Sequence, residues 1–118
     1  LSSPPLFRRI GCAPPASPQA EEGVTDVAMQ GTAFVPKEVT IKQGESVRWT
    51  NLESFPMNHT TTSGDPSDET PGDLWDSALL APGESFTQQF NELGEFEYYC
   101  IPHADTPAMR HAKVIVEP

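Results

Sequence analysis

The chain has 118 residues and a formal net charge of -10, with 7 Lys and Arg against 17 Asp and Glu. This length supports one domain with a single core. The acidic balance argues against binding to nucleic acid or to anionic lipid, because both repel a negatively charged protein. It favours basic partners.

The first part of the chain has the composition of a tether. Residues 1–23 show no apolar period and contain five prolines, Pro4, Pro5, Pro14, Pro15 and Pro18. Such a segment cannot bury enough apolar surface to fold by itself. We therefore expect a proline-rich, disordered tether over residues 1–23 and a folded domain over residues 24–118. No apolar run is long enough to cross a bilayer.

Cys12 lies within this tether and ends an Ile-Gly-Cys sequence. That order is similar to the end of a bacterial lipoprotein signal, which makes Cys12 a candidate lipid-anchor site. Two arginines stand where such a signal needs apolar residues, so a free thiol in a linker is the alternative. The chain starts with Leu rather than Met, and we expect a processed or trimmed product. A disulfide between Cys12 and Cys100 is not expected.

The first half of the domain alternates apolar and polar residues with the period of a β-strand. Residues 24–30 alternate until Gly31, and Phe34 and residues 39–41 continue an apolar face. After a Gln-Gly-Glu turn, residues 46–51 place two large apolar side chains on one face. These patterns predict strands separated by tight turns.

The second half repeats the pattern. Residues 85–90 follow a Pro-Gly-Glu turn, and residues 95–100 place Phe96, Tyr98 and Cys100 on the inward face, which leaves Tyr99 on the outward face. Residues 113–116 predict a closing strand. Short strands at this spacing, with Gly and Pro between them, predict an all-β sandwich.

Residues 63–76 are acidic and contain no basic residue. Their five carboxylates belong to Asp65, Asp68, Glu69, Asp73 and Asp76. Such a run predicts a solvated loop, with a docking patch for a basic partner as the alternative. The spacing does not match the calcium loop of an EF-hand.

Four residues offer the donor set of a mononuclear copper site. Cys100 and His103 are separated by two residues, Met109 follows, and His59 lies upstream. A thiolate, two imidazoles and a weak axial thioether are the ligands of blue-copper electron-transfer sites. Sulfur suits Cu(I) and imidazole suits both oxidation states, so the set needs little rearrangement when an electron moves. The sequence thus predicts copper at His59, Cys100, His103 and Met109.

Several stretches resemble one protein family. Residues 96–103 (Phe-Glu-Tyr-Tyr-Cys-Ile-Pro-His), 44–51 (Gly-Glu-Ser-Val-Arg-Trp-Thr-Asn) and 80–86 (Leu-Ala-Pro-Gly-Glu-Ser-Phe) resemble the cupredoxins of the plastocyanin, amicyanin and pseudoazurin group. The resemblance covers nearly all of residues 24–118. It implies a Greek-key β-sandwich of roughly seven to eight strands with one type 1 copper ion.

The resemblance implies ligand roles residue by residue. His59 and His103 match the imidazole ligands, Cys100 the thiolate and Met109 the axial thioether. The loop between His103 and Met109 is longer than its counterpart in plastocyanins and amicyanins, so Met57 is an alternative axial residue. His111 is assigned no metal.

The implied function is electron transfer rather than catalysis. Four protein ligands leave no open position for a substrate, and a catalytic metal site keeps one. The resemblance implies transient partners such as a c-type cytochrome or a copper or haem oxidoreductase. They would dock on an apolar surface around His103, with acidic residues near Tyr99 as a second contact. We expect a monomer in the periplasm or another extracytoplasmic compartment, with Cys12 as a candidate membrane tether.

Three alternatives remain open. The domain could deliver or store copper, or it could be part of a larger copper oxidase or nitrite reductase. A metal-free adhesive sandwich would require the four ligands to be accidental. A Cys-His hydrolase dyad lacks an orienting partner and an oxyanion hole in the sequence.

Overall fold

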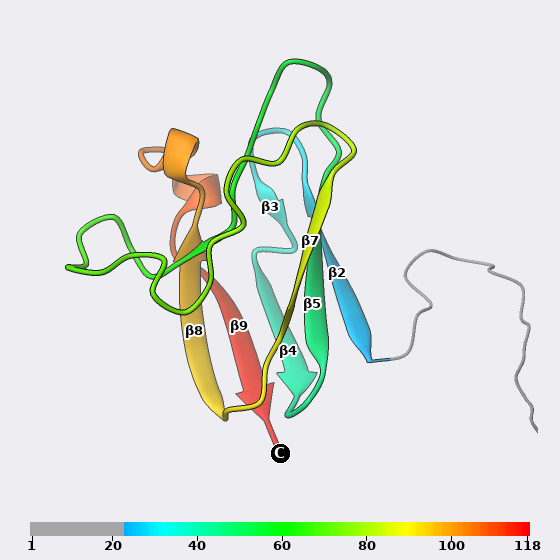
Figure 1. Cartoon of the computed structure of the whole chain (residues 1–118), viewed down its shortest axis with the longest axis vertical. Helices are drawn as coiled ribbons and strands as arrows, with labels where there is room; N and C mark the ends of the chain where they lie inside the picture. Colours follow the sequence, from blue (N-terminus) through cyan, green and yellow to red (C-terminus); the bar gives the residue numbers. More distant parts are fainter. Residues whose placement is uncertain (1–22) are drawn as a thin grey trace, which may run out of the picture.

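A computed structural model describes residues 23–118, and these residues form two stacked four-stranded sheets (Figure 1). The predicted all-β sandwich is confirmed, with eight strands in the described part of the chain. The predictions about Cys12 and about residues 1–22 lie outside the described residues. Within residues 23–118, no helix is long and apolar enough to span a bilayer.

The first sheet has the strand order β3-β2-β5-β7. Its strands are β2 (Val24–Met29), β3 (Phe34–Val35), β5 (Ser46–Asn51) and β7 (Ser85–Gln89). Strand β2 runs parallel to β5, with Val27 opposite Trp49. Because side chains alternate along a strand, this register places both residues on the buried face of the sheet.

The second sheet has the strand order β4-β9-β8-β6. Its strands are β4 (Glu38–Lys42), β6 (Thr62–Ser63), β8 (Gly94–Tyr99) and β9 (Ala112–Glu117). Strand β4 runs parallel to β9, and β8 runs antiparallel to β9. Strand β6 has two residues and no period that a sequence pattern could show.

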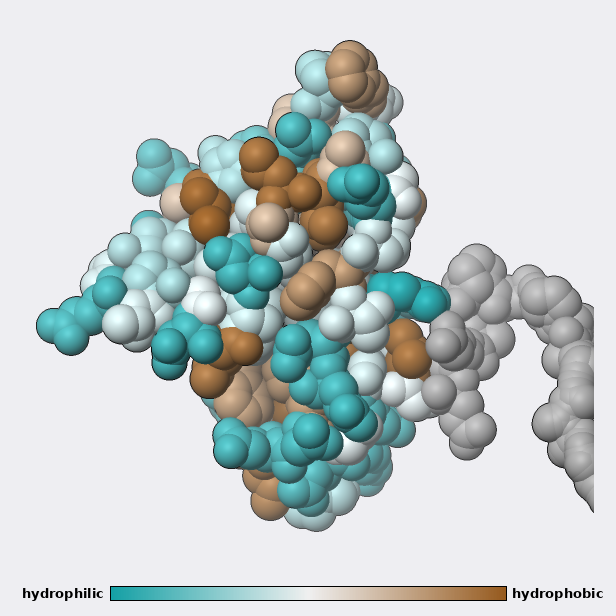
Figure 2. Space-filling view, viewed as in Figure 1, coloured by the Kyte–Doolittle hydropathy of each residue, from teal (hydrophilic) through white to brown (hydrophobic). Residues whose placement is uncertain are grey.

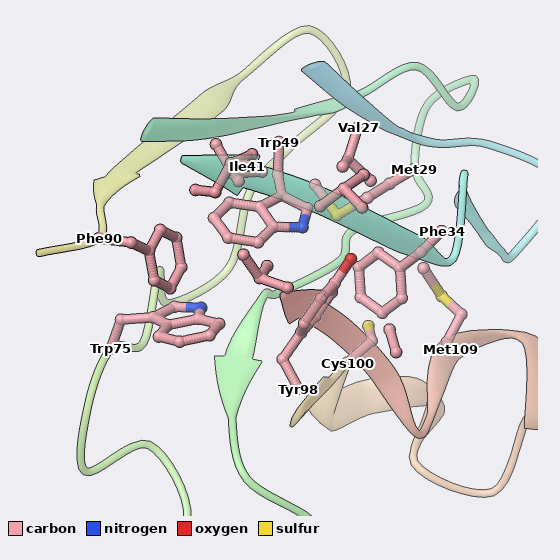
Figure 3. Close-up of a cluster of buried hydrophobic side chains, with 14 of the residues drawn as sticks. Val27, Met29, Phe34, Ile41, Trp49, Trp75, Phe90, Tyr98, Cys100 and Met109 are labelled. Carbon is pink, nitrogen blue, oxygen red and sulfur yellow. The ribbon is translucent and has the colours of Figure 1, made fainter. Parts of the chain in front are cut away.

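An aromatic cluster fills the space between the sheets (Figure 3). The Trp49 side chain is fully buried, and its ring stacks on Trp75 with centroids 5.7 Å apart. Tyr98 meets Trp49 edge-on at 5.2 Å and Phe34 at 4.7 Å. Large aromatic side chains bury much apolar surface, so this cluster fixes the relative position of the two sheets.

Tyr99 does not face solvent as predicted. Only 5% of its surface is exposed. Strand β6 pairs with β8 and places Thr62 opposite Tyr99. Tyr99 is outside the core cluster that contains Tyr98 and Cys100, as alternation predicts, but the predicted exposure was wrong. The acidic loop lies close to its phenol, where burial and the nearby carboxylates of Asp76, Asp65 and Asp68 raise its pKa, and a periodicity argument cannot foresee such a loop.

The connection from β8 to β9 contains two short 3-10 helices. Helix η2 (Ile101–His103) follows Cys100 directly, and helix η3 (Pro107–Met109) precedes β9. Figure 1 shows this connection and the loop after β5 at the same end of the sandwich. We call it the metal end; the β7–β8 turn lies at the opposite end.

Candidate metal centre

Two separate parts of the chain bring the predicted ligands together at the metal end. His59 lies beyond β5 and exchanges backbone hydrogen bonds with Leu80, at 3.1 and 2.7 Å. Cys100 directly follows β8, and its N–H donates to the Met109 carbonyl at 2.9 Å. His103 closes η2, with its N–H donating to the Cys100 carbonyl at 3.1 Å. Each ligand segment is therefore held by backbone hydrogen bonds.

Three donor atoms converge on one point. His59 Nδ1 lies 3.2 Å from His103 Nδ1, and Cys100 Sγ lies 3.7 and 3.4 Å from these two nitrogens. Nitrogen and sulfur donors bind first-row metals at about 2.0–2.3 Å, so three donors in a plane around one ion stand about 3.5–3.8 Å apart. The observed separations of 3.2–3.7 Å lie within or slightly below this range, so the three donors are close enough together to bind one metal ion.

Met109 lies next to Cys100, one of the three donor residues. Its side chain is fully buried, and Figure 3 shows it next to Cys100 at one edge of the aromatic cluster. Met57, the alternative axial residue, keeps 37% of its surface exposed. His111 belongs to a different group, with Glu97 and Asp65, and its side chain is 60% exposed.

Thr60 organises the surroundings of Cys100. Its backbone N–H donates to Cys100 Sγ at 3.3 Å, and its hydroxyl accepts the Ile101 N–H at 2.9 Å. Burial raises the pKa of the Cys100 thiol. A metal ion bound at Cys100 would displace the thiol proton, because the thiolate is the form that binds metals.

The two imidazoles differ in their surroundings. His59 is fully buried, and its Nε2 lies 2.9 Å from Glu53 Oε2. His103 is partly exposed; its burial, and next the proximity of His59, lower its pKa. His103 is therefore a neutral imidazole near pH 7, with a lone pair for a metal.

Glu53, which the sequence analysis missed, belongs to a hydrogen-bonded frame around His59. The Thr32 N–H donates to Glu53 Oε2 at 2.7 Å, and this bond lowers the pKa of Glu53, as does the hydrogen bond with His59. The Asn51 amide donates to the carbonyls of Met57 and Leu80, at 2.9 and 2.8 Å. The only sequence feature that could have indicated this contact is the position of Glu53, six residues before the candidate ligand His59.

An ion pair fastens the acidic loop beside Met109. Arg110 follows Met109, and its guanidinium donates to both carboxylate oxygens of Asp65, at 3.0 and 3.2 Å. This contact holds the pKa of Asp65 far below its usual range. The predicted solvated loop is therefore open to solvent at most of its carboxylates, whereas Asp65 is buried.

Neutralising Asp65 should destabilise the apoprotein in a pH-dependent way. The depressed pKa of Asp65 stabilises the fold fully above the ordinary value of 3.8, and this contribution is lost as the pH falls toward the folded-state pKa. Asp65→Asn should therefore lower the urea midpoint at pH 7, and the difference from wild type should shrink below pH 3.8.

Asp73→Asn supplies the control for this measurement, because Asp73 is an exposed carboxylate in the same loop. We expect its urea midpoint to match wild type at both pH values. An Asp65→Asn difference that stayed constant with pH would contradict the assigned ion pair.

Comparison with known proteins agrees with this geometry. The sequence profile of the family described as "Copper binding proteins, plastocyanin/azurin family" matches residues 21–117. A chloroplastic plastocyanin of Tetradesmus obliquus is 40% identical over 89 residues, covering 71% of this chain and 58% of its own length. An amicyanin of Paracoccus versutus is 35% identical over 91 residues, covering 77% and 63%. The chain thus spans under two thirds of these curated relatives.

Solved structures show the same fold. The crystal structure of amicyanin from Paracoccus versutus superposes with a TM-score of 0.66 at 30% identity, covering 83% of this chain and 85% of that one. A purple cupredoxin from Nitrosopumilus maritimus gives a TM-score of 0.65 at 26% identity, covering 78% and 98%. On the family profile, the relatives and the converging donor atoms, this chain belongs to the plastocyanin/azurin family of copper-binding proteins.

Proposed function

We propose that the chain is a mononuclear type 1 copper electron carrier, which passes one electron at a time between larger redox proteins. The observation that carries the proposal is the convergence of His59 Nδ1, His103 Nδ1 and Cys100 Sγ at separations of 3.2–3.7 Å. Its relatives include a plastocyanin and an amicyanin.

The residues around the site suit such a carrier. Copper, when bound, supplies a one-electron couple between Cu(I) and Cu(II). Cys100 and Met109 offer the sulfur donors that favour the reduced ion, and His59 and His103 offer nitrogen donors that both ions accept. With four protein ligands no position remains open for a substrate, which supports electron transfer rather than catalysis.

Electrons would enter and leave through His103. His59 and Cys100 are buried, whereas His103 reaches partial exposure on η2. Phe55 and Ile101, which belong to the two loops of this end, are 86% and 48% exposed, and Figure 2 shows apolar surface there. A small apolar surface of this kind suits the weak, short-lived complexes of redox partners.

The acidic loop offers a second contact, which the sequence analysis gave as the alternative to a solvated loop. Asp68, Glu69, Asp73 and Asp76 are exposed, and the chain carries a net charge of -10. Opposite charge raises association rates at low ionic strength, so we propose a basic partner such as a c-type cytochrome. Because Tyr99 is buried, the carboxylates rather than the tyrosine ring would meet this partner.

We also propose an extracytoplasmic location. Cys100 can bind copper most readily in a compartment where copper is supplied and where few other thiols compete for the copper. The curated plastocyanin of Tetradesmus obliquus is described as chloroplastic. A periplasmic site and a tether through Cys12 stay proposals of the sequence analysis.

Optical and EPR spectra of the Cu(II)-loaded protein test the proposed function. We expect an intense thiolate-to-copper absorption band and narrow copper hyperfine splitting. Cys100→Ser should abolish the band because the thiolate is lost, and Met109→Ala should shift it because the axial ligand is lost.

His111→Ala supplies the matched control, since its exposed imidazole belongs to the other group of side chains. Its spectrum should equal that of wild type. A pale wild-type complex, or a band that survives in Cys100→Ser, would contradict a type 1 centre and favour a copper delivery or storage protein.

Replacing Phe55 should slow electron transfer without altering the copper spectrum. Phe55 is 86% exposed and belongs to the same loop as His59. In Phe55→Ser, the rate constant for oxidation of a reduced c-type cytochrome, measured by stopped flow, should fall about tenfold, or ~1.4 kcal/mol of docking free energy. Leu93→Ser removes an exposed apolar side chain from the opposite end and should leave the rate unchanged. If Phe55→Ser and Leu93→Ser had the same rate constant for cytochrome oxidation, docking at the metal end would be contradicted.

A further inference from the structure

The buried imidazole of the metal centre is contacted at both ring nitrogens. His59 Nδ1 faces the other donors, at 3.2 Å from His103 Nδ1 and 3.7 Å from Cys100 Sγ. His59 Nε2 lies 2.9 Å from Glu53 Oε2 on the opposite side of the ring. Rotation of the ring would break both sets of contacts, so its orientation is fixed by them.

Glu53 is itself held firmly. Its side chain is 14% exposed. The same Oε2 atom that faces His59 accepts the Thr32 N–H at 2.7 Å. The Glu53 N–H donates to Asn51 Oδ1 at 2.9 Å, while the Asn51 amide donates to the Leu80 carbonyl. The Leu80 carbonyl also accepts the His59 N–H at 3.1 Å. Asn51 therefore links the backbone of Glu53 to the same carbonyl that holds the backbone of His59.

The contacts at Oε2 determine where the proton of His59 lies. An oxygen that already accepts a backbone N–H and faces a second nitrogen at 2.9 Å acts as an acceptor of both. The proton between His59 and Glu53 is then on Nε2, and Nδ1 keeps its lone pair for the metal. A carboxylate behind a ligating histidine also makes the imidazole a stronger donor.

Charge adds a second effect. The carboxylate brings a negative charge next to a fully buried ligand, where solvent screens it little. A negative charge stabilises the more highly charged metal ion. Cu(II) would gain more from Glu53 than Cu(I), and the reduction potential would fall.

We propose that Glu53 is a positioning residue of the metal centre: it fixes His59 in the Nε2-protonated form and lowers the reduction potential of the bound copper. This inference rests on the proposed electron-carrier function for its second half only. The first half concerns the apoprotein. The two imidazoles thereby take different roles. Glu53 fixes the orientation of His59 through Nε2, whereas His103 lies toward the surface.

The protonation of His59 can be measured in the metal-free protein. Nitrogen-15 NMR of the wild-type apoprotein should show Nε2 protonated and Nδ1 unprotonated at pH 7. Glu53→Gln should keep this form, because its amide oxygen still accepts, and Glu53→Leu should lose it and give a mixture. A wild-type signal for protonated Nδ1, or an unchanged tautomer in Glu53→Leu, would overturn the assignment.

The potential is measured on the copper-loaded protein. In Glu53→Gln the ratio of Cu(II) to Cu(I) affinity should fall at least tenfold, a rise in potential of about 59 mV for one electron. Glu84→Gln is the matched control, because it removes an exposed carboxylate that caps Ala81 in a turn close along the chain to Leu80. Its ratio should stay within threefold of wild type.

The outcomes separate the two proposals. A wild-type protein without a type 1 copper spectrum would end the electron-carrier proposal, while the apoprotein NMR result would still decide the role of Glu53 in positioning His59. A type 1 spectrum with equal potentials in wild type and Glu53→Gln, or with equal shifts in both variants, would overturn the charge effect and leave the carrier function intact.

Discussion

The hydrogen bonds around Cys100 join the two parts of the chain that supply the metal centre. Thr60, next to His59, donates its backbone N–H to Cys100 Sγ, and Cys100 donates its own N–H to the Met109 carbonyl. If these bonds broke, the upstream imidazole and the downstream sulfurs would no longer share one site. The sandwich brings Thr60 to Cys100 because β6, which starts two residues after Thr60, pairs with β8, with Thr62 opposite Tyr99.

The aromatic cluster between the sheets supports the residues that surround the metal centre. Trp49 and Tyr98 lie on opposing sheets and meet at 5.2 Å, two residues before Asn51 and Cys100 respectively. A close-packed interior is hardly compressible, so ligands attached to this cluster move little. In the proposed electron carrier, rigid ligands would keep the structural rearrangement during electron transfer small. The surface is built differently, with apolar side chains near His103 and carboxylates along the loop of residues 63–76.

Much of this could be predicted from the sequence. Alternation is strong in residues 46–51 because one face of the strand is buried, and His59, Cys100, His103 and Met109 are residue types with specific metal chemistry. Other features depend on how loops fold onto strands. The burial of Tyr99, the two-residue strand β6, the Arg110–Asp65 ion pair and the contact of Glu53 with His59 join residues without a shared period.

X-ray absorption at copper in both oxidation states tests the central claim, a site held rigid by the fold, most directly. We predict one short copper–sulfur distance and two copper–nitrogen distances in Cu(I) and Cu(II) alike, with little change between the states. Loss of a nitrogen ligand on reduction, or gain of a water oxygen on oxidation, would contradict the account, because either would show that the fold does not hold His59, Cys100 and His103 in place.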